Sequence, residues 1–399
     1  MKKINILIFS PVSLEYGRGG EFYSIDLAAG LQKYYNVALY HTNILYNKRL
    51  LTKERVINEF KERGFKFRNI ERMKFATINL FDRQFNFPFP LDIIKLYKRL
   101  KRNDIVYLSV SNIKINLIFM LYSLFNNRIK FIIGYHKPFV SEKLFSFYTL
   151  KYQISILLFS LFKRNFYHQT ISLHAKKFLK NFYNSKKIFF IIEGMNLETF
   201  FNDKFEKKRN PKLKIIYVGA LNDEHKGVGV LLEAIENLLE ENQGLNLSFE
   251  IYGFGSLESE VKRLEKKFPQ FIKYFGYIDF KTLVKSYKNN DVLISCSRRE
   301  PFGRVMIEAL AGKLVIICSK TFGSIDILRD KDFAFFLKKL SPNEIKDKFL
   351  KVYNLWLEHP EELKRLQNSA NKYAFENYSM SREIEMFKKV IDKIIISSK

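Results

Sequence analysis

Two carboxylates eight positions apart mark the segment of this sequence best suited to chemistry. Glu300 and Glu308 follow an apolar stretch at residues 291–295 that is typical of a buried strand, and a turn and a helix are predicted over residues 301–311. Backbone amides near Gly303 would then begin a helix, where anions bind well, and the carboxylates would accept from hydroxyl groups. The pattern is suited to a phosphorylated sugar, although two solvated surface glutamates would look the same.

Glycines and a lysine follow other predicted strands. Lys226 and Gly227 lie beyond a predicted strand, where a lysine can reach a phosphate as a point charge, although an exposed loop lysine is equally ordinary. Gly19 and Gly20 fall between the first predicted strand and the first predicted helix, where the backbone could approach a ligand closely. They do not form a complete GxGxxG motif, and a plain flexible loop is the alternative.

A histidine ends another predicted strand. His136 follows residues 130–135, so it would lie at the ligand-binding edge of a parallel sheet or else serve as a capping or packing residue. Gly253 and Gly255 follow a further strand and are equally ambiguous. No group of His, Cys, Asp and Glu has metal-ligand spacing, and no nucleophile motif stands out. We therefore expect chemistry without a metal or a cofactor.

Apolar, β-branched runs alternate with amphipathic helical patterns, which predicts βαβ units and parallel sheets. A polar stretch at residues 202–212 predicts a linker. We expect two doubly wound, Rossmann-like domains that face each other across a cleft, over residues 1–200 and 201–379. The last helix, at about residues 380–399, is expected to pack back on the first domain. The predicted strands cover residues 3–10, 36–41, 105–109, 130–135, 169–172, 188–192, 214–218, 248–252, 291–295 and 314–318.

The composition is that of a globular protein of two ordinary domains, with 399 residues and 47% hydrophobic residues. Only two cysteines, Cys296 and Cys318, are present, which favours a reducing compartment over a disulfide framework. The short apolar run near the N-terminus ends at Ser10 and Pro11, so we interpret it as a strand rather than a signal peptide. No apolar run reaches about 18 residues. We therefore expect a cytoplasmic protein.

The net charge is +27 and it is uneven. Residues 1–200 contain 33 Lys and Arg against 13 Asp and Glu, whereas residues 201–399 contain 35 against 28. The first half therefore suits a polyanionic partner such as nucleic acid, an anionic membrane or a phosphorylated substrate, unless it reflects compositional bias alone. Residues 142–166 form a basic amphipathic pattern. That pattern fits a helix on a membrane surface, or one packed on the sheet with its lysines in water.

Together these segments resemble the retaining glycosyltransferases with the GT-B fold, family 4, also called glycosyl transferases group 1. The family's Glu-x7-Glu motif is similar to Glu300–Glu308. Its strand-Gly-x-Leu…Lys-Gly element is similar to residues 218–227, its Gly-x-Gly segment to residues 253–255 and its Phe-x-Gly strand end to residues 274–276. The domain-junction turn resembles residues 193–196.

The resemblance implies transfer of a hexose from a nucleoside diphosphate sugar to a glycan or lipid-linked acceptor, with retention of configuration and without a metal. It implies catalytic roles for His136, Glu300 and Lys226, with Lys226 on the diphosphate, Glu300 on the sugar and Glu308 on the ribose. The donor-binding residues that it implies are Gly19, Gly20, Lys226, Gly227, Gly255, Gly276, Tyr277, Glu300, Phe302, Gly303, Arg304 and Glu308.

One departure from the family pattern affects the donor site. Ala220 stands where the family usually has an arginine, which removes a second cation from the diphosphate unless Arg304 or Arg18 replaces it. A protein that binds a sugar nucleotide without transferring it is therefore an alternative. A nucleic-acid-binding protein is a weaker alternative, since no recognised nucleic-acid module is present.

The basic first half favours a cytoplasmic enzyme held peripherally at the inner membrane surface.

Overall fold

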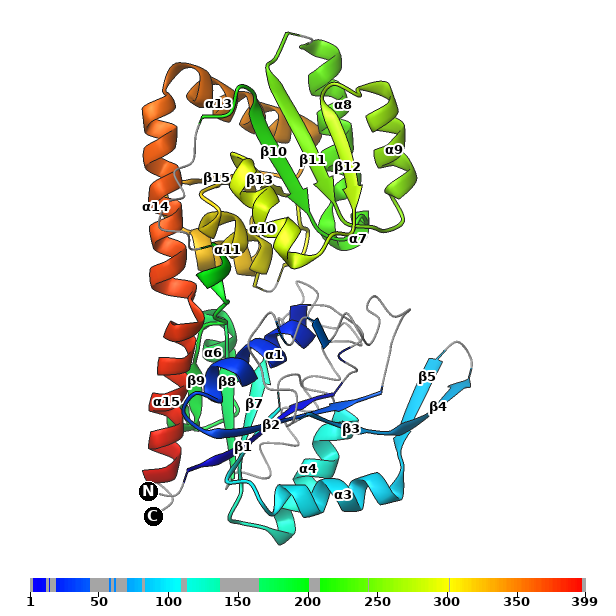
Figure 1. The fold of residues 1–399 in the computed structure, drawn as a ribbon, viewed down its shortest axis with the longest axis vertical. Coiled ribbons are helices and arrows are strands. Elements are labelled where there is room, and N and C mark those ends of the chain that lie inside the picture. The colour runs from blue at the N-terminus through cyan, green and yellow to red at the C-terminus, as the bar shows by residue number, and fades with distance from the viewer. Residues whose placement is uncertain are drawn as a thin grey trace. The chain divides into compact units, whose positions relative to one another are not determined.

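The chain divides into two compact units in a computed structural model (Figure 1). Unit 1 comprises Met1–Asn196 and Met380–Lys399, and unit 2 comprises Leu197–Ser379. The structure describes residues 3–11, 14, 19–43, 57–58, 61, 70–80, 83–108, 113–136, 165–200, 209–242, 244–300 and 302–396.

Unit 1 is built on a parallel sheet in the order β3-β2-β1-β6-β7-β8-β9. The order reverses between β1 (Asn5–Ser10) and β6 (Ile105–Leu108), as in a doubly wound fold. A separate antiparallel hairpin joins β4 to β5. The remaining strands are β2 (Asn36–Thr42), β3 (Ile70–Met73), β4 (Phe75–Leu80), β5 (Arg83–Pro88), β7 (Lys130–Tyr135), β8 (Phe166–Thr170) and β9 (Ile188–Phe190).

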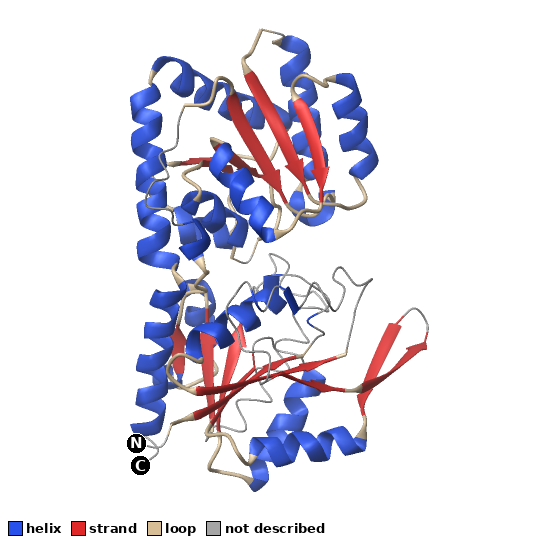
Figure 2. Cartoon of the chain, viewed as in Figure 1, coloured by secondary structure: helices blue, strands red, loops and turns tan. Residues whose placement is uncertain are grey.

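Helices cover both faces of this sheet, as Figure 2 shows. Because side chains alternate along a strand, Ile6 and Ile8 of β1 enter one core and Leu7 and Phe9 enter the other. The first core lies under α1 (Gly19–Leu31) and α15 (Met380–Ile396). The second lies under α3 (Pro90–Leu100), α4 (Ile113–Phe125) and α6 (Leu173–Leu179). A short 3-10 helix, η3 (Ser185–Lys187), precedes β9.

Unit 2 is built on a second parallel sheet, in the order β12-β11-β10-β13-β14-β15, which reverses between β10 and β13. Its strands are β10 (Leu213–Val218), β11 (Leu247–Tyr252), β12 (Ile272–Gly276), β13 (Val292–Ser295), β14 (Val315–Cys318) and β15 (Ala334–Phe336). Its helices are η4 (Leu197–Phe200), α7 (Asp223–Lys226), α8 (Val228–Glu241), α9 (Glu258–Lys267), α10 (Phe280–Asn289), α11 (Arg304–Ala311), α12 (Phe322–Leu328), α13 (Pro342–Glu358) and α14 (Pro360–Tyr378).

Every strand that the sequence predicted is present, with ends shifted by up to three residues. The sequence did not predict the edge strands β3 and β15 or the β4–β5 hairpin, and it indicated only the end of β12, at residues 274–276. Edge strands such as β12 expose alternate side chains and so lack a continuous apolar run. The glycines predicted in a loop, Gly19 and Gly20, are instead the first residues of α1. The predicted linker and the basic amphipathic segment fall mainly on residues 201–208 and 142–164, which lie outside the described residues.

Candidate active site

The strand order of unit 2 brings two of the predicted residues to one place. Parallel sheets bind ligands outside the carboxyl ends of their strands, at the point where the strand order reverses. In unit 2 this point lies between β10 and β13. Lys226 follows β10 and Glu300 follows β13, so the fold places both in the connections that leave the carboxyl ends of these neighbouring strands.

A one-turn helix, α7, holds Lys226. The Asn222 side chain caps this helix by accepting from the amides of His225 and Lys226. Gly227 then takes a left-handed conformation with φ of 61°, and a Cβ there would lie 2.3 Å from the carbonyl oxygen of Cys296. Only glycine fits such a position. The backbone next to Lys226 therefore lies against the residue that follows β13.

The Lys226 ammonium contacts the Glu300 carboxylate. Nζ lies 2.6 Å from Oε2, and both side chains are largely covered. Arg298 ties the same two loops a second time, because its guanidinium donates to the Asp223 carboxylate at 2.8 Å and to the Asp223 carbonyl at 3.0 Å. A cation for a phosphate and a carboxylate for hydroxyl groups thus stand side by side on braced loops.

The rest of the two-glutamate segment begins α11. Gly303 precedes the helix with φ of 96°, and the amide of Gly323 donates to the Glu300 carbonyl at 2.9 Å. Phe302 is buried and packs edge-on against Tyr378. The segment is therefore anchored on both sides, with Glu300 on the loop and Arg304 as the first helical residue.

Glu308 lies within α11 and is buried. Its Oε2 accepts from the Tyr287 hydroxyl at 3.1 Å. Burial, together with the neighbouring carboxylate of Glu308, raises the pKa of Tyr287 well above its usual value, so the phenol stays protonated and donates. The two glutamates therefore differ, because Glu300 pairs with a cation and Glu308 is held by a tyrosine inside the domain.

The glycines after β11 are required by close backbone packing. A Cβ on Gly253 would lie 1.8 Å from the Gly219 carbonyl oxygen, and one on Gly255 would lie 2.3 Å from that of Leu221. The loops after β10 and β11 consequently touch through their backbones. The neighbouring strand β12 ends at Gly276, and the residue that follows it, Tyr277, is 42% exposed.

Ala220 is exposed on the loop after β10. Its carbonyl accepts from the buried Tyr217 hydroxyl at 2.9 Å. This hydrogen bond fixes the backbone of the turn. Position 220 carries no charge, although it is exposed and could accommodate the arginine of the family pattern.

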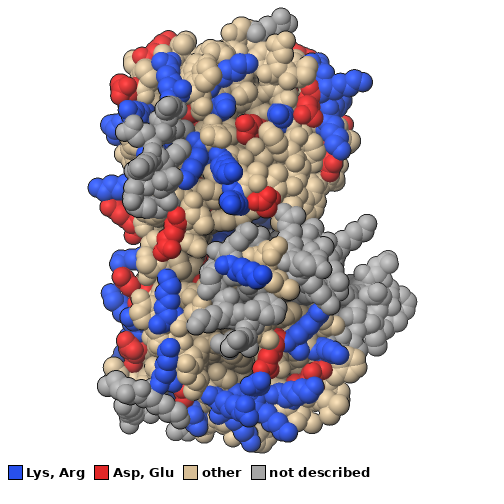
Figure 3. All heavy atoms as spheres, in the orientation of Figure 1, with Lys and Arg blue, Asp and Glu red and all other residues tan. Residues whose placement is uncertain are grey.

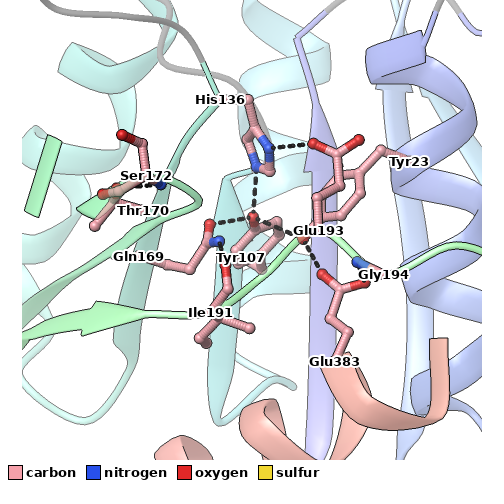
Figure 4. A network of polar contacts seen from close by, with 10 residues as sticks. All are labelled: Tyr23, Tyr107, His136, Gln169, Thr170, Ser172, Ile191, Glu193, Gly194 and Glu383. Atoms are coloured by element: carbon pink, nitrogen blue, oxygen red, sulfur yellow. Dashed lines mark hydrogen bonds and ion pairs between the residues drawn. The ribbon is translucent and has the colours of Figure 1, made fainter. Parts of the chain in front are cut away.

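His136 lies in unit 1, directly after β7, and both of its ring nitrogens have partners (Figure 4). Nε2 is 2.8 Å from the Tyr107 hydroxyl, and Nδ1 is 3.3 Å from Oε2 of Glu193. The imidazole and the carboxylate are both largely buried. The Tyr23 ring also packs against the imidazole, with centroids 4.4 Å apart.

The directions of the neighbouring hydrogen bonds show what the Tyr107 hydroxyl offers to His136. The Gln169 amide nitrogen donates to the Ile191 carbonyl at 3.0 Å, so its oxygen faces Tyr107 and accepts from the phenol at 2.9 Å. A phenol has one hydrogen, which is used in that bond. The Tyr107 oxygen is therefore an acceptor beside Nε2 of His136, as the Glu193 carboxylate is beside Nδ1.

A second buried carboxylate completes this network in unit 1. Glu383 of α15 accepts from the Tyr23 hydroxyl at 2.6 Å and from the Gly194 amide at 2.9 Å. His136 was recognisable from the sequence, whereas its neighbours in the network were not: Tyr23, Tyr107, Gln169 and Glu383. A polar Gln169 inside a predicted buried strand was the available signal.

Residues 198–373 match the family model described as glycosyl transferases group 1. These residues belong to the glycosyl transferases group 1 family. The group 1 domain thus contains Lys226, Glu300 and the glycine loops described above.

Several curated proteins are also similar in sequence to parts of this chain. Part of this chain resembles a glycogen synthase of Thermodesulfovibrio yellowstonii, at 29% identity over 134 residues, 32% of this chain and 26% of that protein. The chain spans between 26% and 55% of the length of the first curated relatives that it matches.

Two solved structures share the fold of the whole chain. The pneumococcal O-GlcNAc transferase GtfA, in complex with UDP and GlcNAc, has a TM-score of 0.73 at 13% identity and covers 99% of this chain and 100% of its own. Anabaena HepE in complex with UDP has a TM-score of 0.71 at 14% identity, covering 98% and 100%. The fold is therefore GT-B, with two Rossmann-like domains.

Proposed function

We propose that this protein is a glycosyltransferase that moves a hexose from a nucleoside diphosphate sugar to a glycan or lipid-linked acceptor, with retention of configuration. The observation that carries the proposal is the Lys226–Glu300 pair at the reversal point of a group 1 domain. Its loops are braced by Arg298 and by Gly227, so the charges are positioned before any ligand binds.

Lys226 binds the diphosphate in this proposal and stabilises the charge that develops on the leaving group. An ammonium has three hydrogens, so Lys226 can hold Glu300 and a phosphate oxygen together. Glu300 binds hydroxyls of the transferred sugar, and Glu308 binds the ribose with its position set by Tyr287. The amides that begin α11 support the phosphate. The remaining donor contacts are assigned to Gly19, Gly20, Gly227, Gly255, Gly276, Tyr277, Phe302, Gly303 and Arg304.

His136 is assigned to the sugar near the reacting carbon. Its imidazole is oriented by Tyr107 and Glu193, so that a ring which contacts substrate cannot turn freely. The positive field at the diphosphate comes from Lys226 and helix amides in this proposal, so no metal is required. Transfer is expected to persist in excess EDTA.

UDP-sugars are the first donors to test, because the structures of similar fold were determined with UDP, with UDP-glucose, or with UDP and GlcNAc. A cytoplasmic location is proposed with this donor class. It is supported by two buried cysteines that are both free thiols.

The test is a panel of nucleotide sugars assayed for release of nucleoside diphosphate and for transfer. Lys226→Ala and Glu300→Gln should each lower turnover by about 100-fold or more, since each removes a charged contact to the reacting groups. Lys346→Ala is the matched control, because it removes an ion-paired lysine from the same domain. Full turnover in both site variants would refute the assignment. Inversion of the anomeric centre, measured by NMR, would refute retention.

A sugar-nucleotide-binding protein without transfer is the second candidate, and the exposed Ala220 favours it. Binding of UDP-sugars detected by thermal shift, with neither hydrolysis nor transfer for any donor and acceptor offered, would select this candidate.

A further inference from the structure

Large apolar side chains gather on the surface of two neighbouring helices in unit 1. Seven of the fifteen large hydrophobic residues that are exposed in the described chain lie between positions 89 and 125. We call these residues, with the basic residues around them, the α3–α4 surface. Its apolar members are Phe89, Leu91, Ile94, Leu117, Leu121, Leu124 and Phe125.

Helix α4 exposes an apolar stripe. Leu117, Leu121, Leu124 and Phe125 recur at the spacing of one helix face, and Phe125 is 90% exposed. The residues between them, such as Phe119, are buried in the core beneath the sheet. The outer face of a surface helix is normally polar, so packing among the described residues of unit 1 does not explain this stripe.

Helix α3 lies beside α4 (Figure 1). The Tyr97 ring of α3 packs against the Tyr122 ring of α4, with centroids 4.8 Å apart. The Tyr97 hydroxyl also donates to the Ile118 carbonyl at 3.4 Å. On its outer side α3 exposes Leu91 and Ile94.

Basic side chains are concentrated on α3 and in the turns that follow α3 and α4, and Figure 3 shows Lys and Arg gathered near α3. Residues 89–130 contain eight Lys and Arg and two acidic residues. Asp92 is buried, and the Asp104 carboxylate lies 3.4 Å from the Arg128 guanidinium. The exposed basic residues are Lys95, Lys98, Arg99, Lys101, Arg102 and Arg128.

We propose that the α3–α4 surface binds the face of an anionic lipid bilayer. Leucine and phenylalanine tips can enter the boundary of headgroups and acyl chains, while lysines contact lipid phosphates. Two copies of this chain meeting through the same surface would oppose their basic residues, so like charges disfavour a symmetric dimer there. No described helix is long and apolar enough to cross a bilayer, so the contact is peripheral. The proposal goes beyond the catalytic function and needs no donor to be tested.

Flotation of the full chain with vesicles tests this surface. Vesicles of pure phosphatidylcholine are compared with vesicles containing 30% phosphatidylglycerol, at low and high salt. We expect binding to the anionic vesicles that weakens with salt, and at least tenfold weaker binding for the triple variant Leu121→Ser, Leu124→Ser, Phe125→Ser. Lys95→Glu with Lys98→Glu should weaken binding and reduce its salt dependence. Leu173→Ser is the control, because it removes an exposed leucine elsewhere in unit 1.

The variants change exposed residues, so circular dichroism should show an unchanged fold. Equal binding to neutral and anionic vesicles, or no binding, would overturn the proposal. Binding retained in the triple variant would also overturn it and would point to residues 142–166 instead. A concentration-dependent dimer that the triple variant abolishes, without vesicle binding, would assign the surface to a second copy.

Discussion

In the proposed donor site, position 220 lies on the same connection as Lys226 and carries no charge. Ala220 is exposed, its turn is fixed by Tyr217, and Lys226 on the same loop is already paired with Glu300. An arginine side chain at this position would extend into solvent rather than into the core. Substitutions that change one charge at a time can therefore be tested in each unit.

Ala220→Arg should tighten UDP binding, because it restores a charge-assisted contact to the diphosphate. Such contacts are worth about 1.5–3 kcal/mol, or roughly 10- to 100-fold in Kd. Titration calorimetry with UDP measures the change, and Ala220→Gln controls for side-chain size without charge. An affinity equal to that of the control would show that no phosphate lies near this position.

Glu193→Gln should lower kcat by roughly 10- to 100-fold, because the carboxylate that faces Nδ1 of His136 loses its charge while its shape is kept. UDP affinity should stay unchanged, since Glu193 belongs to unit 1 and the residues assigned to the diphosphate belong to unit 2. Glu198→Gln, an exposed glutamate five residues away, is the control. If kcat is equal in the two variants, Glu193 does not position His136.

At the scale of elements, strands β2 and β8 bury His41 and His168. Each imidazole would protonate more readily if water surrounded it. Burial lowers the pKa of His41 to about 4 and that of His168 to about 3. His168 lies between the Tyr183 ring, 3.6 Å away, and the Tyr135 hydroxyl. The unfolded chain therefore binds more protons than the folded chain below about pH 6.5.

Unit 1 should lose stability as the pH falls from about 6.5 toward 4, because both histidines must remain neutral in the folded sheet. Stability is fully present above the unfolded pKa, and each histidine costs up to a few kcal/mol at acid pH. Urea unfolding at a series of pH values measures this slope. His168→Phe keeps the ring stack and should flatten the slope, whatever it does to stability at pH 7. An unchanged slope would mean that acid sensitivity arises elsewhere.

At the scale of the whole molecule, the C-terminal helix belongs to the unit in which the chain began. Ile384, Phe387 and Ile391 of α15 enter the core beside α1, and Glu383 of the same helix is fully buried. Unit 1 is thus completed by residues that follow all of unit 2 in the sequence.

Glu383→Ala should destabilise unit 1 by about 3 kcal/mol, because the Tyr23 hydroxyl and the Gly194 amide lose their buried acceptor. Glu385→Ala changes an exposed glutamate on the same helix and should cost less than about 0.5 kcal/mol. Chemical unfolding of both variants provides the comparison. Equal stability would contradict the role assigned to this carboxylate.

Much of the fold and part of the site followed from local sequence signals. Continuous apolar runs predicted the central strands, since a parallel strand covered on both faces must be apolar throughout. The edge strands β3 and β15 were not predicted, because they are short and only partly buried. The two-glutamate segment, Lys226 and His136 were recognisable from their places after strands.

The sequence by itself thus determined two parallel sheets and which loops follow their strands. Only the tertiary structure decided which loops meet, because contacts such as Lys226 with Glu300 depend on strand order rather than on local propensity. The same holds for His136 with Glu193, and for the apolar face of α4. Periodicity predicts that a helix is amphipathic, but only packing shows which of its apolar residues remain uncovered.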